Sequence, residues 1–211
     1  MKCYFLFFFL FQVYLFSSIA WNAESLIQHL KNVIKEGLQD PQFLLIDSNN
    51  VIKNQDLGLI NSKQNELFKK YNISTYIFLL SSIREGRKKF ILNLLKQLPA
   101  IHNKISIDNS IILLINMRKK KSVFNYGKKI TRLFSKQQKK IIRKELYKYL
   151  KIKMYSEGIV NTLEKILEEL KTKSYKNLII AIIILVLFTL FKIFRKKNLN
   201  PNLIHKKSKT N

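Results

Sequence analysis

The hydrophobic positions of the chain form short continuous runs in its middle part. Three runs, at residues 43–46, 74–83 and 110–117, are largely apolar and are bounded by polar residues. Runs of this kind are typical of strands that are buried on both faces of a sheet. A fourth run, 122–126, follows the charged turn 118–121, so it predicts the returning strand of a hairpin.

Between and after these runs, apolar residues recur every three or four positions. This spacing predicts helices over residues 21–40, 58–71, 85–98, 136–152 and 157–172. Strands therefore alternate with helices along the chain. Because parallel strands need such crossover helices, the order predicts an α/β domain with a mainly parallel sheet covered by helices.

The N-terminal end has a different pattern, because residues 3–16 are almost entirely apolar and follow Lys2. Ser18 and Ala20 are small residues at the −3 and −1 positions of a cleavage site that follows Ala20. This arrangement predicts a secretory signal peptide over residues 1–20, cleaved after Ala20. The alternative is an uncleaved membrane anchor, although the run is short for a span of about 20 residues.

The C-terminal end contains a second long apolar segment. Residues 178–191 carry no charge, and extension to residue 194 gives a predicted transmembrane helix over 178–194. The alternative is a buried core helix, but such a helix normally has a polar face. The basic tail 195–211 is then cytoplasmic. These features predict a single-pass type I membrane protein with residues 21–177 on the lumenal or extracellular side.

Within the predicted lumenal or extracellular part, residues 21–40 are expected to form a short amphipathic lead-in and residues 41–172 the α/β domain. The whole chain has 39 Lys and Arg against 13 Asp and Glu, a net charge of +26. A strongly basic chain suggests nucleic acid as a partner. The secretory signal and the span argue against this. The charge then reflects either a composition rich in residues with AT-rich codons or attraction to anionic lipid or an acidic partner surface.

No complete catalytic motif is present, and the single cysteine, Cys3, excludes a disulfide framework. Asp47 ends the first predicted strand, where ligands bind in open parallel sheets, so it is the candidate catalytic residue. Asp47, Asn49 and Asn50, together with Asp108 before the third strand, are candidate oxygen ligands for calcium. The alternative for the first three is an Asx turn at the end of the strand.

Two further candidates are sites of contact or modification. The turn Arg118, Lys119, Lys120 and Lys121 could contact phosphate or an acidic partner, and the alternative is a solvated hairpin tip. Asn72 begins an Asn-Ile-Ser tripeptide, which is an N-glycosylation acceptor and agrees with a lumenal location.

Four segments together resemble a known family: LLIDSNNVI at 44–52, STYIFLLSSI at 74–83, DNSIILLINMRKKKSVFNYG at 108–127, and KIKMYSEGIVNTLEKI at 151–166. Their order and spacing resemble the TPM domain of thylakoid acid phosphatases, photosystem II repair proteins and modulators of the levamisole receptor. The resemblance covers residues 41–172.

The resemblance also has implications for particular residues. Asn125-Tyr126-Gly127 stands where the family usually has Gly-Tyr-Gly, which implies a turn in which Asn125 adopts a left-handed backbone. The family often has a further acidic residue in its first loop, where this chain has Asn49 and Asn50.

For the function, the resemblance implies a binding or accessory module for a membrane complex, similar to the modulators of a receptor or channel. The partners are then the lipid bilayer and a membrane protein. The alternative is a weak acid phosphatase, in an organelle reached through the secretory route. The absence of a complete catalytic motif favours the module.

Overall fold

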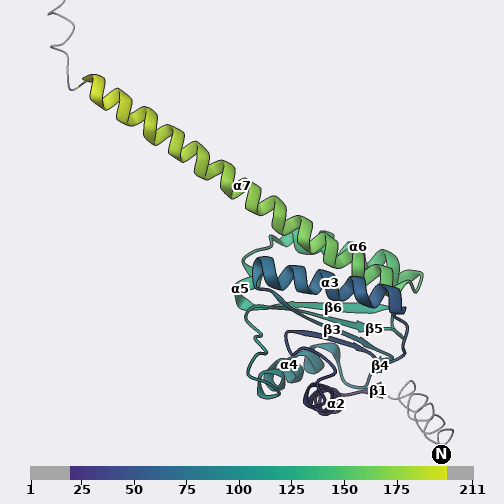
Figure 1. Ribbon diagram of the computed structural model, residues 1–211. Coiled ribbons are helices and arrows are strands. Elements are labelled where there is room, and N and C mark those ends of the chain that lie inside the picture. Colours follow the sequence, from purple (N-terminus) through teal and green to yellow (C-terminus); the bar gives the residue numbers. More distant parts are fainter. Residues whose placement is uncertain (1–19, 199–211) are drawn as a thin grey trace, which may run out of the picture. The chain divides into compact units, whose positions relative to one another are not determined.

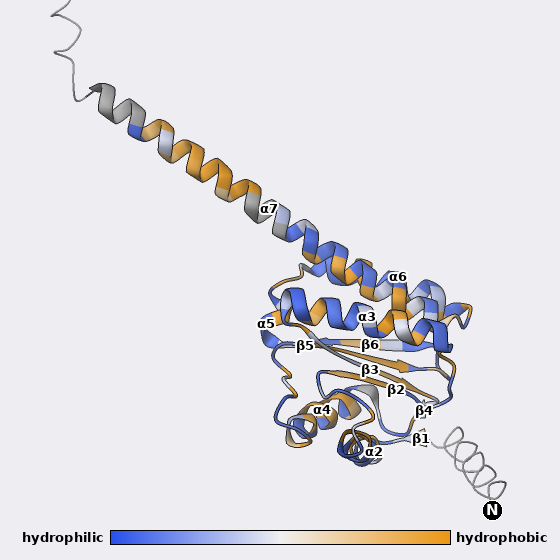
Figure 2. Ribbon diagram, in the orientation of Figure 1, coloured by the Kyte–Doolittle hydropathy of each residue, from blue (hydrophilic) through white to orange (hydrophobic). Residues whose placement is uncertain are grey.

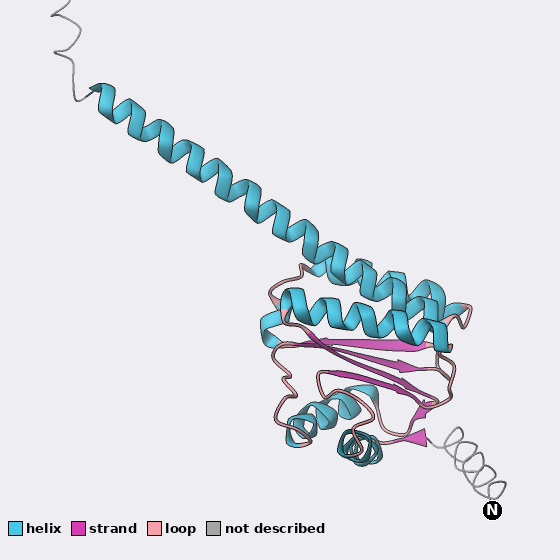
Figure 3. Ribbon diagram, in the orientation of Figure 1, coloured by secondary structure: helices cyan, strands magenta, loops and turns pink. Residues whose placement is uncertain are grey.

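A four-stranded sheet forms the centre of the first of two compact units of the chain. The structure is a computed structural model, and it describes residues 20–198. The strands are β2 (Phe43–Asp47), β3 (Ser74–Leu80), β5 (Ser110–Asn116) and β6 (Lys121–Tyr126), in this spatial order. The first three are parallel and β6 is antiparallel to β5 (Figure 3).

Helices cover both faces of the sheet (Figure 1). One face carries α2 (Ala23–Lys35) and α4 (Arg87–Gln97). The other carries α3 (Asn54–Tyr71), α6 (Lys136–Lys151) and the first turns of α7 (Tyr155–Asn198). Two short helices, η1 (Leu98–Ala100) and α5 (Lys128–Thr131), join these elements. The prediction of a helix-covered α/β domain with a mainly parallel sheet is confirmed.

The central strands owe their position to their continuous apolar sequence. Every residue of β3 and β5 is buried, and both strands are mostly orange in Figure 2. Tyr76 and Phe78 are fully buried in a cluster that also contains Leu26 and Leu30 of α2 and Phe90 of α4. Each fully buried side chain of this size contributes about 1.5–3 kcal/mol, so this cluster fixes α2 and α4 on the sheet.

Local sequence signals set several helix ends. Asn22 and Ser25 form a capping box at the start of α2, and Ser135 and Gln138 form another at the start of α6. Helix α3 ends at Asn72, whose backbone is left-handed with φ of 54° and whose N–H donates to the Phe68 carbonyl at 2.8 Å. These ends depend on residues a few positions apart.

Two features of the predicted layout differ in the structure. The predicted strand 74–83 is divided, because β3 ends at Leu80 and β4 (Ser82–Ile83) pairs with β1 (Ala20–Trp21) in a separate parallel pair. Helix α2, predicted as a lead-in to the domain, packs into the core with Leu26 and Leu30 fully buried. Both differences come from contacts between segments about 60 positions apart.

The implied turn at residues 125–127 is wrong. Asn125 pairs with Ile112, so it lies within β6 and not in a turn. The hairpin turn is at residues 117–120, where Lys120 has a left-handed φ of 47°. Gly127 has an ordinary negative φ of −56°, but a Cβ there would overlap the backbone carbonyl oxygens of Ile107 and Asp108. Gly127 is therefore needed for a close backbone approach.

The predicted helix 157–172 and the predicted span 178–194 belong to one helix, α7, and the boundary between the two compact units follows Leu167 within it. Among the residues that the structure describes, no helix meets the combined length and apolarity needed to cross a membrane. Residues 1–19, which hold nearly all of the predicted signal peptide, and residues 199–211 of the tail lie outside the described residues.

Candidate functional site

The loop after β2 is organised around the carboxylate of Asp47. One carboxylate oxygen accepts the backbone N–H of Asn49 at 3.2 Å, and the other accepts that of Ile52 at 2.7 Å. Asn50 adopts a left-handed backbone with φ of 51°, and its N–H donates to the Asp47 carbonyl at 3.4 Å. This geometry is that of an Asx turn, in which a side chain takes the place of a backbone acceptor.

Burial and hydrogen bonding act in opposite directions on Asp47. Burial raises the pKa of the Asp47 carboxyl, and the loop N–H groups, Ile52 first, lower it; burial is the larger effect, so the pKa lies above its ordinary value. The physical reason is that removing a carboxylate from water disfavours its charged form. Asp47 therefore takes up a proton at a higher pH than an exposed aspartate does.

Serine side chains and backbone groups connect this loop to the ends of the neighbouring strands. The N–H of Ser48 donates to the Leu79 carbonyl, and the Ser48 hydroxyl accepts the N–H of Ser81, both at 2.9 Å. The N–H of Arg118 then donates to the Ser81 carbonyl at 3.0 Å. The Asp47 loop and the basic hairpin turn thus lie at the same end of the sheet, where the parallel strands finish.

The hairpin turn itself has the features of a solvated tip. Its side chains are exposed at Arg118, Lys119, Lys120 and Lys121. The turn is closed by the N–H of Lys119, which donates to Asn116 Oδ1 at 2.9 Å, and by the N–H of Lys120, which donates to the Met117 carbonyl at 3.1 Å. Lys120 Nζ donates to the Lys151 carbonyl at 3.2 Å. The turn offers positive charge to a ligand at this end of the sheet.

The four candidate calcium ligands do not come together. Asp108 precedes β5, and it is exposed at the opposite end of the sheet from Asp47, where the parallel strands begin. Asn49 and Asn50 lie in the Asp47 loop, where Asn49 Oδ1 accepts the Ser48 hydroxyl at 2.9 Å. Both Asp47 oxygens accept N–H groups of their own loop, and these donors compete with a cation for the carboxylate. Among the described residues, no group of three acidic, histidine or cysteine side chains is placed to hold a metal.

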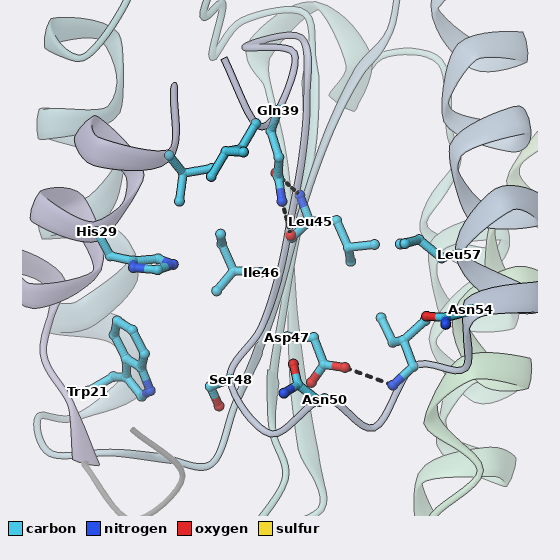
Figure 4. A pocket seen from close by; sticks show the side chains of 13 residues that line it. Trp21, His29, Gln39, Leu45, Ile46, Asp47, Ser48, Asn50, Asn54 and Leu57 are labelled. Atoms are coloured by element: carbon cyan, nitrogen blue, oxygen red, sulfur yellow. Dashed lines mark hydrogen bonds between the residues drawn. The ribbon is translucent and has the colours of Figure 1, made fainter. Parts of the chain in front are cut away.

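A groove runs beside β2, next to the Asp47 loop (Figure 4). Its volume is about 610 Å³, and Trp21 and His29 line it on one side of β2 while Asn54 and Leu57 line it on the other. The rings of Trp21 and His29 meet edge to face, with their centroids 5.7 Å apart. Burial lowers the pKa of the His29 imidazole, and the negative charge of Glu36 raises it. Burial is the larger effect, so the ring is favoured in its neutral form at neutral pH.

Gln39 closes part of the same groove. Its side-chain amide accepts the N–H of Leu45 at 2.9 Å and donates to the Leu45 carbonyl. It therefore pairs with β2 as a neighbouring strand would. Sequence reasoning identified neither Gln39 nor the Trp21–His29 pair as part of a site, because each acts on a residue outside its own element.

Asn72, the candidate glycosylation residue, is exposed at the end of α3. An acceptor asparagine has to be reachable from solvent, and this one is. Its modification stays a prediction.

A family model of the TPM domain matches residues 45–169, which is more than half of the chain. The chain belongs to the TPM-domain family. The resemblance noted from the sequence is thereby confirmed. No curated protein matches the chain.

Solved structures share the fold of this TPM domain. The BA42 protein from the psychrophilic bacterium Bizionia argentinensis has a TM-score of 0.51 at 14% identity, over 58% of this chain and 83% of that chain. The N-terminal domain of a protein from P. gingivalis has a TM-score of 0.58 at 15% identity, over 74% of this chain and 94% of that chain. At these identities the likeness shows the fold.

Proposed function

We propose that this chain is a membrane-anchored binding module. Its TPM domain contacts a partner protein of a membrane complex, and residues 178–194 hold the domain at the bilayer. After cleavage of residues 1–20, the domain lies on the lumenal or extracellular side and the tail 195–211 is cytoplasmic. The chain then acts as an accessory subunit of a receptor- or channel-like complex.

The binding role is supported by the use of Asp47. It is the candidate catalytic carboxylate, yet both of its oxygens accept backbone N–H groups of its own loop, from Asn49 and Ile52. A carboxylate used in this way holds the loop in shape, which suits a domain whose surface binds a partner. The exposed basic turn at the same end of the sheet adds positive charge that attracts acidic groups.

The membrane role is supported by the composition and exposure of the second unit. Ile184, Leu185 and Phe191 of α7 are each more than 60% exposed, and the other large apolar side chains within residues 179–190 are at least 45% exposed. Apolar side chains on every side of a helix are unfavourable in water, and lipid removes that cost. Lys192 near the end of the segment can extend its amine to the headgroups.

The membrane role is tested with the full chain expressed in cells and a matched variant that lacks residues 178–194. We expect the full chain to stay in the membrane pellet after alkaline carbonate extraction and the variant to be released. Protease added to sealed vesicles should remove the tail and spare the domain. Release of the full chain by carbonate would contradict the anchor.

The binding role is tested by purifying the full chain in mild detergent after chemical crosslinking in intact membranes. We expect a crosslinked membrane protein to be recovered in a fixed ratio to the chain. Recovery of the chain alone, over a range of crosslinker concentrations, would contradict the role.

A second candidate function is a weak acid phosphatase. Two features favour it. Burial raises the pKa of Asp47, and the basic turn 118–121 lies at the same end of the sheet. A carboxyl group that holds its proton to a higher pH can act as a general acid. The positive turn could attract a phosphate ester.

The phosphatase is tested with the full chain in mild detergent and p-nitrophenyl phosphate as substrate, at about pH 5 and about pH 7, with and without calcium. Asp47→Asn is compared with Asp108→Asn, a matched change at the opposite end of the sheet. Activity that Asp47→Asn abolishes and Asp108→Asn preserves would make this chain an enzyme. Equal activity in all three proteins would exclude Asp47 from any reaction.

A further inference from the structure

Strand β6 forms one edge of the sheet, and its hydrogen-bonding pattern shows which backbone groups face outward. The N–H of Gly127 donates to the Ser110 carbonyl, and Asn125 and Val123 pair with Ile112 and Leu114. In an antiparallel ladder, alternate residues point toward the partner strand. The N–H and C=O groups of Ser122 and Phe124 therefore point away from β5, and within residues 20–198 no strand pairs with this edge.

A groove of about 480 Å³ runs along these outward-facing groups. One wall is the apolar side of α4, with Ile91, Leu92 and Leu95, and the floor is β6 itself, with Val123 and Phe124. Leu92 is 53% exposed. Outward-facing backbone donors and acceptors that no strand uses, beside an apolar wall, are what an extended peptide needs to add a strand to a sheet.

The groove is bordered by positive charge. Lys88 of α4 and Arg143 of α6 line it, and both side chains are exposed. Helix α4 has no acidic residue, and α6 has one, Glu145, which is paired with Lys148 at 2.7 Å. An incoming segment therefore meets cations that are not neutralised by acidic residues of these two helices.

We propose that this groove binds an extended acidic segment of a partner protein as an additional strand beside β6. The proposal rests on the proposed function, because it names the partner chemistry of the binding module. Side chains of a strand alternate between its two faces. The bound segment is therefore expected to place apolar side chains against Leu92 and Leu95 and acidic side chains toward Arg143, with a further acid near Lys88.

Two other occupants are disfavoured by charge. The chain's own tail, residues 195–211, contains lysines and an arginine but no acidic residue. A second copy of the chain, pairing β6 with β6, would bring Lys121 and the neighbouring basic helices of two copies together. Like charges at such an interface oppose binding, so an acidic partner segment fits the groove better than either.

The first test measures peptide binding to the full chain in detergent micelles by fluorescence anisotropy. The probe is a labelled synthetic peptide of about eight residues in which glutamate and valine alternate. Two controls are the same peptide with lysine for glutamate and the acidic peptide with N-methyl groups along one edge, which block strand pairing at unchanged charge. We expect N-methylation to weaken binding at least about tenfold. Equal binding of both acidic peptides would reveal general charge attraction and overturn the proposal.

The second test uses matched variants of the chain. Leu92→Glu changes the groove wall, and Leu59→Glu makes the same change at an exposed leucine of α3 outside the groove. We expect Leu92→Glu to weaken peptide binding at least about tenfold and Leu59→Glu to alter it less than about twofold. Arg143→Gln and the adjacent, exposed Lys144→Gln form a second matched pair with the same expectation. Equal effects within both pairs would overturn the proposal.

Hydrogen exchange of the backbone provides a check that does not depend on affinity. Bound acidic peptide should slow exchange at Ser122 and Phe124, and unchanged exchange in a peptide-saturated sample would contradict strand addition. The crosslinking experiment separates this proposal from the broader one. If Leu92→Glu still captures the membrane partner, the groove proposal fails and the binding module stands; if no partner is captured by the unmodified chain, the binding module fails whatever the peptide does.

Discussion

The two edge strands of the sheet, β2 and β6, each border a groove, but their outward backbone groups differ in whether they have hydrogen-bond partners. At β2, the side chain of Gln39 takes both the N–H and the C=O of Leu45. The N–H of Phe43 donates to the Asp40 carbonyl at 2.9 Å. At β6, only the Tyr126 carbonyl has such a partner, the Thr131 hydroxyl at 3.2 Å, among the outward groups of the described strand.

The difference teaches how one sheet can be closed at one edge and receptive at the other. An exposed edge strand is a template for pairing with another chain. Gln39 removes that template from β2 by imitating a neighbouring strand, so the groove there is suited to side-chain contacts alone. Strand β6 keeps its template beside an apolar wall, and the basic residues around it restrict what can bind.

The largest effect is expected from Gly127→Ala, which tests how the end of β6 is fixed. A Cβ at this position overlaps the backbone carbonyls of Ile107 and Asp108, which cannot rotate away as side chains can. We expect the free energy of unfolding to fall by about 3 kcal/mol or more. Urea unfolding followed by the fluorescence of the buried, single Trp21 measures it.

Gly58→Ala is the matched control for that change. Gly58 lies in α3, where an added Cβ would meet open space, and alanine favours a helix by up to about 1 kcal/mol. Stability should therefore be unchanged or higher. A loss of the same size in both variants would contradict the assigned role of Gly127.

The second prediction separates the inner and outer groups of β6. The N–H of Val123 faces Leu114 in the ladder, so Val123→Pro removes a sheet hydrogen bond and should cost about 3 kcal/mol. The N–H of Ser122 faces outward, so Ser122→Pro should cost about 1 kcal/mol or less. Thermal unfolding of the two variants checks this. Similar losses would mean that the ladder assignment is wrong.

The third prediction opens the closed edge. Gln39→Ala removes two hydrogen bonds to Leu45 and should lower the free energy of unfolding by about 2 kcal/mol, at about 1 kcal/mol for each bond. Exchange of the Leu45 amide hydrogen should become faster. Gln42→Ala, three positions away, is the matched control and should change stability by less than about 0.5 kcal/mol. If Leu45 exchange is unchanged, Gln39 does not protect the edge.

The smallest change is expected from Asp47→Asn, and it should depend on pH. Burial raises the pKa of Asp47 in the folded protein above its ordinary value of 3.8. The stabilisation linked to this shift is complete below pH 3.8 and is lost as the pH rises through the raised folded pKa. Asparagine does not titrate, so the stability of the unmodified chain relative to the variant should decrease with rising pH across this window.

Urea unfolding of both proteins at a series of pH values measures that difference directly, because the other titrating groups are shared and cancel. A relative stability that increases with pH would show that the N–H groups of Asn49 and Ile52 dominate over burial.

The sequence predicted the elements of the fold well and the site in part. The apolar runs of β2, β3 and β5 and the three-to-four spacing of the helices each report on burial of a whole element, so they can be read along the chain. The Asx turn at Asp47 was an open alternative, and its hydrogen bonds span two to five positions. Asp108 is a candidate by residue type only. Its position before β5 already predicts that it lies at the opposite end of its strand from Asp47, and the structure keeps the two apart.

The features that sequence reasoning missed depend on distant contacts. Nothing in the pattern shows that Ser82 and Ile83 leave the main sheet to pair with Ala20 and Trp21. The role of Gly127 arises from the approach of residues 107 and 108, and not from a left-handed turn. Glycine is compatible with both, so its presence alone could not decide between them.

By itself, the sequence determined the α/β class, the family, the long apolar segment at each end and the strong positive charge, because these are properties of composition and of local periodicity. The tertiary structure decided which strands became edges, how Gln39 closes one of them and how α4, β6 and Arg143 surround the other. Those outcomes follow from strand order and helix packing, which bring together groups whose relation is set by the fold and leaves no regular spacing along the chain.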